Sequence, residues 1–135
     1  MVWLLPTLLY VVAVGALGVT GNLALRTLRW PELILWTTVI YAAVGSALLV
    51  TRQATLRFTG DTGWAVFSGV LAIGGLIVLY VALGTGQVTK VVSVSAAYPA
   101  VTLVLSALFL SEGVTVGRVA GTALIIAGVV VVTLS

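Results

Sequence analysis

The sequence predicts an all-α membrane protein with five transmembrane helices. Of its 135 residues, 61% are hydrophobic and 7% are charged, whereas soluble domains are about 45–50% apolar and about 25% charged. A chain of this length has too little interior to bury so much apolar surface, so lipid is the expected environment. Only helices and closed β-barrels span lipid. Barrel strands of about 10 residues alternate apolar with polar positions, so the long, uninterrupted apolar runs favour helices.

Five apolar runs separated by charged residues give the predicted spans. They are Leu4–Leu25, Leu33–Thr51, Gly63–Leu83, Val91–Leu110 and Val119–Leu134. Each approaches the ~20 residues that cross a bilayer as a helix, and the last is at the short limit of about 17 residues. The loops between them are short, as between antiparallel neighbours in a helix bundle. We expect a single domain over residues 1–135.

Helix-end signals agree with these boundaries. Pro31 suits the first helical position of the second span, and Glu32 beside it lies at the positive end of the helix dipole. Asp61 or Thr62 can cap the third span, and Thr115 can cap the fifth. The capping and charged residues therefore fall at helix ends.

The fourth span contains a proline in the middle of its apolar run. Pro99 has no N–H, so the carbonyl of Ser95 loses its helical partner. Tyr98, Thr102 and Ser106 share a broad face with Ser95 at helical spacing. Freed carbonyls in membranes are satisfied by neighbouring Ser or Thr, by water or by a ligand, and transporters place sites at broken helices near the midplane. The alternative is a packing kink in which Thr102 and Ser106 bond back to their own helix.

No predicted span carries a charge near its middle, where a charge costs about 2.5–3.5 kcal/mol on insertion scales. This favours a route lined by neutral polar and aromatic groups over proton-coupled export of cations. Asn22 near the end of the first span and Tyr41 near the middle of the second are of this kind, although both are also compatible with ordinary core packing. The candidates for a substrate pathway are Asn22, Tyr41, Ser95, Tyr98, Pro99 and Thr102.

The fifth span has a face of small residues. Gly117, Gly121 and Gly128 recur at helical spacing along it, and small residues let membrane helices approach closely. This face is our candidate for a contact between chains, with packing inside one chain as the alternative. Just before this span, Glu112 is placed to meet Arg118 or the positive end of the helix.

The Lys and Arg residues are balanced between the two membrane faces. With five antiparallel spans, three lie on each face: Arg26, Arg29 and Lys90 on one, and Arg52, Arg57 and Arg118 on the other. Orientation follows the difference in these counts, and here the difference is zero. Small loops can balance by chance. The second interpretation is dual topology, in which the chain inserts both ways and pairs as an antiparallel homodimer, an inverted arrangement that many transporters use.

Several classes of chemistry are disfavoured by the composition. The chain has no histidine and no cysteine, which removes the usual ligands of zinc and haem and every Ser-His-Asp set. We therefore expect no cofactor, no metal site and no enzymatic activity. Six scattered Lys and Arg residues do not form a nucleic-acid surface.

Several features of the second half occur in the order and spacing of one known repeat. They are Tyr80, Ala82, Leu83 and Gly86; then Val94, Ser95 and Tyr98–Pro99; then Leu110-Ser111-Glu112; then Gly121 and Gly128 around "ALIIAG". In this the chain resembles an EamA-type repeat of the drug/metabolite transporter superfamily. The match of the first half is looser, with Asn22 of "GNLALR" where the family often has a polar residue.

The resemblance implies a small-molecule transporter of the plasma (inner) membrane. Full-length relatives contain two inverted five-helix repeats, so a single repeat implies alternating access by a homodimer or by a heterodimer with a paralogue, in a lipid bilayer, with a small organic solute as substrate. The chain is also similar to small multidrug resistance proteins, which pair antiparallel. Those have an acidic residue in their first helix, whereas this chain has Asn22. The alternative function is a non-transporting membrane subunit that assembles with a paralogous chain.

Overall fold

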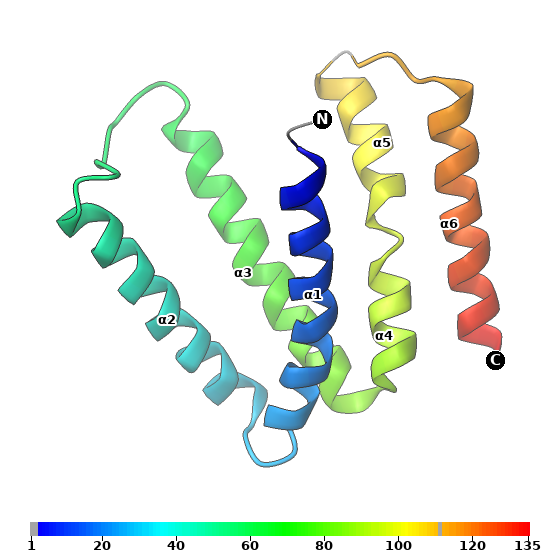
Figure 1. The fold of residues 1–135 in the computed structure, drawn as a ribbon, viewed down its shortest axis with the longest axis horizontal. Helices are drawn as coiled ribbons and strands as arrows, with labels where there is room; N and C mark the ends of the chain where they lie inside the picture. Colours follow the sequence, from blue (N-terminus) through cyan, green and yellow to red (C-terminus); the bar gives the residue numbers. More distant parts are fainter. Residues whose placement is uncertain (1–2, 111) are drawn as a thin grey trace. The chain divides into compact units, whose positions relative to one another are not determined.

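The described residues, 3–110 and 112–135 of a computed structural model, form helices joined by short loops (Figure 1). The helices are α1 (Leu4–Ala24), α2 (Trp30–Val50), α3 (Thr62–Thr85), α4 (Val88–Ser95), α5 (Tyr98–Phe109) and α6 (Val116–Leu134). Together α4 and α5 make the fourth span, Val88–Phe109, so the structure has five helical segments long and apolar enough to cross a membrane. The predicted all-α, five-span fold is confirmed. Ser111, inside the Leu-x-Glu pattern, lies outside the described residues.

The five spans suit a bilayer in both length and surface. They contain 19 to 24 residues, and even the shortest is about 29 Å long as a helix, close to the ~30 Å hydrocarbon core. Among the described residues, only Tyr80 and Leu83 are buried hydrophobic side chains, and most of the large apolar ones are exposed. Helices that are apolar on all sides belong in lipid.

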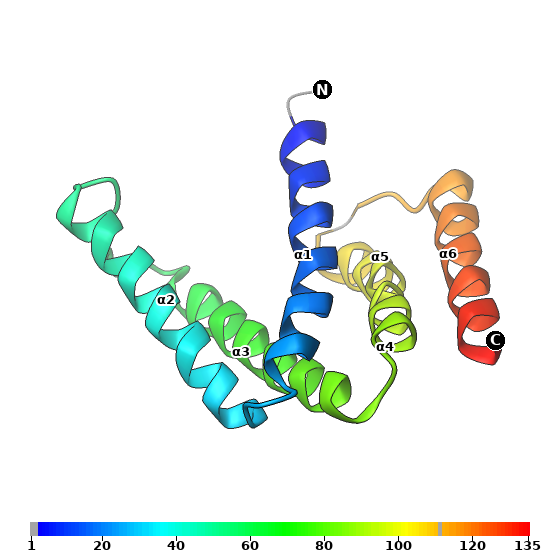
Figure 2. The ribbon, with the colours of Figure 1, turned by 60° about the horizontal axis from the view of Figure 1, so that its bottom comes forward.

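The helices group into two compact units, which divide after Thr85. In the first unit, both α1 and α2 pack against α3, and Figure 2 shows α1 meeting α3 near the C-terminal ends of both. The contact uses a buried glycine of α1, because a Cβ on Gly21 would lie 3.4 Å from Tyr80 Cε1 and 3.5 Å from Leu83 Cδ1. Small residues at this crossing allow the two backbones to approach.

The ends of α2 are stabilised by local hydrogen bonds. The Arg29 N–H donates to Glu32 Oε2 at 2.7 Å, which satisfies one of the free donors of the first turn. The helix begins at Trp30, so Pro31 occupies its second position rather than the predicted first. At the other end, Arg52 adopts a left-handed conformation with φ of 56°.

In the second unit, α6 packs against both α4 and α5. Two polar contacts anchor the ends of α6. The Thr115 hydroxyl accepts a hydrogen bond from the Arg118 N–H at 3.3 Å, which confirms the predicted cap. Lys90 Nζ donates to the carbonyl of Thr133 at 3.2 Å, placing a cation at the negative end of the helix dipole.

Candidate functional site

The fourth span is broken into two helices rather than bent as one. Ala96 and Ala97 have ψ angles of −3° and −6°, which are far from the α-helical value of about −42°. The Ala97 N–H donates to Val94 and the Ala100 N–H to Ala97, both at 3.0 Å, so the ladder narrows locally to the tighter i to i−3 pattern. Pro99 then lies in the first turn of α5, where a missing N–H costs little.

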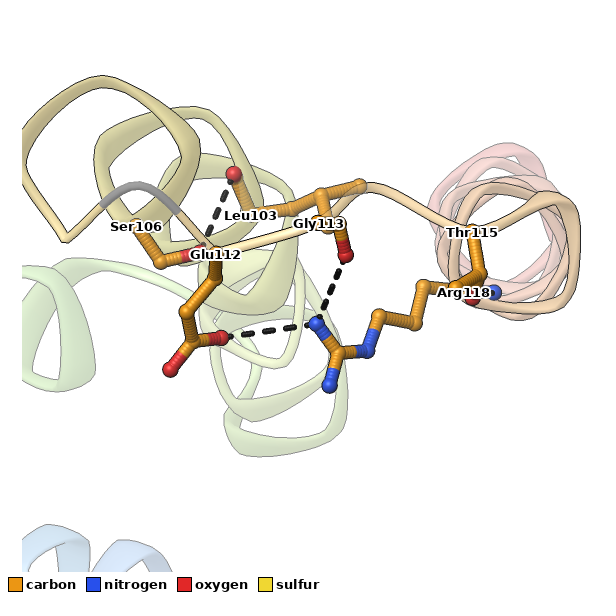
Figure 3. Close-up of polar contacts among 6 residues, drawn as sticks. All are labelled: Leu103, Ser106, Glu112, Gly113, Thr115 and Arg118. Carbon is orange, nitrogen blue, oxygen red and sulfur yellow. Dashed lines mark hydrogen bonds and ion pairs between the residues drawn. The ribbon is translucent and has the colours of Figure 1, made fainter.

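The hydroxyl groups around this break bond back to their own helices. Ser95 Oγ donates to Val92 at 2.8 Å, and Thr102 Oγ1 donates to Tyr98 at 3.2 Å. Ser106 Oγ likewise donates to the carbonyl of Leu103 at 3.2 Å (Figure 3). This is the bonding expected of the packing alternative. Since each hydroxyl has one proton and two lone pairs, their oxygens still present acceptors.

A groove of about 520 Å³ runs between α5 and α6 and collects many of the predicted residues. It is open along one side, and it is lined by Tyr98, Pro99, Thr102, Leu103, Ser106, Glu112, Gly117, Arg118, Gly121, Thr122 and Ile125. Ser95 and Gly128 are absent from the described lining. Leu103 and Ile125, which we did not predict, lie four residues after Pro99 and Gly121, so helical spacing from the predicted residues could have found them.

One end of the groove carries opposite charges. Arg118 Nη1 lies 3.4 Å from Glu112 Oε2 and donates to the Gly113 carbonyl at 3.0 Å, and Figure 3 shows the guanidinium between these two acceptors. This is the contact expected for Glu112. Both side chains are about half exposed, at 53% and 52%. Exposed pairs contribute about 0–1 kcal/mol, so the pair can open at little cost.

The glycines of α6 leave space beside the helix. A Cβ added to Gly117, Gly121 or Gly128 would meet no atom within 4 Å. None of the three is therefore required for close packing within the described chain. Gly117 and Gly121 line the α5–α6 groove, and because they have no side chains they leave space on its α6 side.

The two candidates from the first unit, Asn22 and Tyr41, are not among the lining residues of this groove. The Asn22 amide donates to the carbonyl of Leu83 at 2.9 Å and so links α1 to α3. Tyr41 lines a different groove, together with Thr37 and Tyr80. The sequence did not predict that Thr37 and Tyr80 line the same groove. Within the described residues, no cluster of three or more potential metal ligands is present.

These features define an integral, multi-pass membrane protein. Its helices expose apolar side chains, and its charges lie in loops or in the first turns of helices. Comparison with known families narrows this class. The model of the EamA-like transporter family matches residues 1–134, so the chain belongs to that family, within the drug/metabolite transporter superfamily.

Among curated proteins, the chain is similar to an uncharacterized protein of Methanocaldococcus jannaschii. The two are 36% identical over 88 residues, which cover 65% of this chain and 60% of the relative. The chain thus matches less than two thirds of that relative's length. No solved structure matches this chain.

Proposed function

We propose that the chain transports a small organic solute as a dimer, by alternating access. Family membership supports a transporter. The observation that carries the proposal is the α5–α6 groove, which combines the Tyr98 ring, hydroxyl oxygens and a separable ion pair beside a helix break. Aromatic and neutral polar groups hold a solute without the cost of a permanent charge at the bilayer centre.

A second copy is the partner that we propose to close this groove. The groove is open on one side, and a polar solute exposed to hydrocarbon would leave its hydrogen-bonding groups unsatisfied. The open space beside Gly121 and Gly128 supports close approach of another helix. The balanced Lys and Arg counts allow that copy to insert in the opposite orientation.

The positions of these glycines allow antiparallel pairing of α6 with its copy. Gly121 and Gly128 lie four residues before and three residues after Ile125, the middle residue of α6. In an antiparallel pair centred on Ile125, Gly121 of one chain therefore lies near Gly128 of the other. Two such contacts related by a two-fold axis would hold the dimer together.

The break in the fourth span supplies the proposed hinge. Around Ala96 and Ala97 the backbone hydrogen bonds between α4 and α5 are reduced mainly to the i to i−3 type, so α5 can rock relative to α4 with little loss of backbone bonding. A few residues at the ends of helices commonly absorb such domain motions. Rocking would expose the groove first to one side of the membrane and then to the other.

The test is transport by the purified chain in liposomes. Uptake from a metabolite mixture is measured by mass spectrometry, and chemical crosslinking reports the dimer. Pro99→Ala restores a backbone donor at the break, and Tyr98→Ala removes the groove's aromatic side chain. We expect each to reduce uptake at least about tenfold, the effect of about 1.4 kcal/mol, while the dimer persists.

Tyr10→Ala is the matched control, since Tyr10 is an exposed tyrosine of α1 and should leave uptake unchanged. Normal transport by both the Pro99 and Tyr98 variants would refute the assignment of the site. The alternative function is a non-transporting subunit that assembles with a paralogous chain, and the open groove of a single chain is compatible with it. Inactivity of the pure chain, together with co-purification of a related chain, would favour that alternative.

A further inference from the structure

The loop between α2 and α3 is the longest connection between the described helices. It runs from Thr51 to Asp61 and joins the end of α2 to the start of α3 (Figure 1). Both helices are long and apolar enough to span a membrane, and their lengths match the hydrocarbon core. The loop therefore lies at the surface of the bilayer.

Hydrogen bonds fix both ends of this loop. The Gln53 and Ala54 N–H groups both donate to the Leu48 carbonyl, at 3.0 and 3.2 Å. At the other end, the Thr59 N–H donates to Thr62 Oγ1 at 2.8 Å. Residues 55–58 between these contacts belong to neither helix nor strand, and irregular backbone does not enter the hydrocarbon core where it faces lipid. The segment therefore stays at the level of the headgroups.

This segment carries two large apolar side chains with little protein around them. Leu56 is 81% exposed and Phe58 is 89% exposed. Trp64 in the first turn of α3 is also exposed, and its ring centroid lies 6.4 Å from that of Phe67. Tryptophan is typical of the boundary between lipid and water, and exposed apolar groups at that depth are suited to contact with the membrane.

The same loop carries positive charge without a partner. Arg52 and Arg57 are both exposed, and the loop has one acidic residue, Asp61. Among the described residues the ion pair is Arg118–Glu112, so neither loop arginine is paired with a carboxylate there. Guanidinium groups bind phosphate in a bidentate way. A second copy of this loop would bring the same excess of positive charge and be repelled, whereas an anionic lipid surface attracts it.

We propose that the α2–α3 loop is an anchor for anionic phospholipid. Leu56 and Phe58 insert among the outermost acyl carbons, and Arg52 and Arg57 bind headgroup phosphates. Segments that lie in a membrane interface divide apolar and basic residues in this way, and long arginine side chains can reach the phosphates from an apolar level. This partner belongs to the first unit and does not depend on transport through the α5–α6 groove.

Bimane labels on single cysteines test the insertion, because the chain has no cysteine of its own. They replace Leu56, Phe58 or, as a control in the same loop, Gly60, in the full chain reconstituted in vesicles. Lipids brominated on their acyl chains quench a label in the membrane, and iodide on both sides of the membrane quenches a label in water. We expect lipid quenching at positions 56 and 58 and iodide quenching at position 60.

Two results would overturn the insertion. Iodide quenching at all three positions would place the loop in water. Shielding of positions 56 and 58 from both quenchers would mean that protein, such as a second copy, covers them.

The label at position 58 also tests the choice of lipid. In vesicles that mix phosphatidylglycerol with phosphatidylcholine, bromine on phosphatidylglycerol should quench the label more strongly. Arg57→Gln should reduce this preference about fivefold, the effect of one basic residue near an anionic surface, whereas Arg57→Lys keeps the charge and should retain it. Equal quenching by the two lipids, or an unchanged preference in Arg57→Gln, would overturn the assignment of the headgroup.

Arg26→Gln is the matched control, since it removes the same charge from the loop between α1 and α2. It should leave the preference at position 58 unchanged. An equal loss in this variant would show that net charge, and not the α2–α3 loop, selects the lipid, and would likewise overturn the proposal.

Discussion

At the scale of single residues, Arg52 has a left-handed backbone conformation that is unfavourable for a residue with a side chain. Its φ of 56° follows the end of α2, and its N–H donates to Leu49 at 3.1 Å while the Gln53 N–H donates to Leu48 at 3.0 Å. This is the Schellman ending of a helix, which usually has glycine at the left-handed position. An L-residue there costs about 1–2 kcal/mol.

We therefore expect Arg52→Gly to stabilise the protein by about 1 kcal/mol, because glycine adopts a positive φ without a steric cost. Unfolding by SDS in mixed micelles measures the change. Arg57→Gly is the control, since it removes the same charge from the same loop but not from a positive φ. An equal shift in the two variants would mean that charge, and not backbone geometry, is responsible.

Side-chain hydrogen bonds were predicted correctly from the sequence where the two bonded residues are close in the chain. The Thr115 cap joins residues three apart, and the contact between Glu112 and Arg118 joins residues six apart. The bond from Asn22 to Leu83 joins residues 61 apart, and it depends on how α1 is rotated against α3. Because these helices are apolar on all sides, no polar face indicates that rotation.

At the scale of helices, the proline of the fourth span predicted a disturbance but not its position. The break occurs at Ala96 and Ala97, ahead of Pro99, because proline is accepted in the first turn of a new helix and not in the interior of a continuing one. The bounds of the spans could be predicted from the length of apolar runs. The grooves could not, since they depend on which faces of neighbouring helices meet.

The crossing of α1 and α3 gives a prediction at this scale. Gly21→Val should destabilise the protein by about 1–3 kcal/mol, as overpacking does, because its added carbons meet the Tyr80 and Leu83 side chains. Gly15 lies on the same helix, and a Cβ added there would meet no atom within 4 Å, so Gly15→Val should be tolerated. Thermal unfolding in detergent measures both. Equal destabilisation would show that valine disturbs the helix itself rather than the crossing.

At the scale of the whole molecule, the chain leaves most of its large apolar side chains exposed. Lipid accounts for apolar surface, but it does not satisfy the hydroxyl groups and the ion pair that line part of the mainly apolar groove between α5 and α6. A second copy related by a two-fold axis would close that groove. The composition and span count predicted the membrane class, and the motif order predicted the family. The proposed pairing of chains has no support in the sequence beyond the balanced charges and the glycines of α6.

The central claim is that two copies pair antiparallel through α6, and cysteine crosslinking tests it most directly. The chain has no cysteine of its own. Positions 121 and 128 are about 10 Å apart along a helix, whereas a disulfide needs Cα atoms within about 7 Å. Antiparallel pairing predicts that co-expressed Gly121→Cys and Gly128→Cys chains form a covalent dimer on oxidation, while neither variant does so alone. Efficient crosslinking of each variant with itself, or none in the mixture, would contradict the claim.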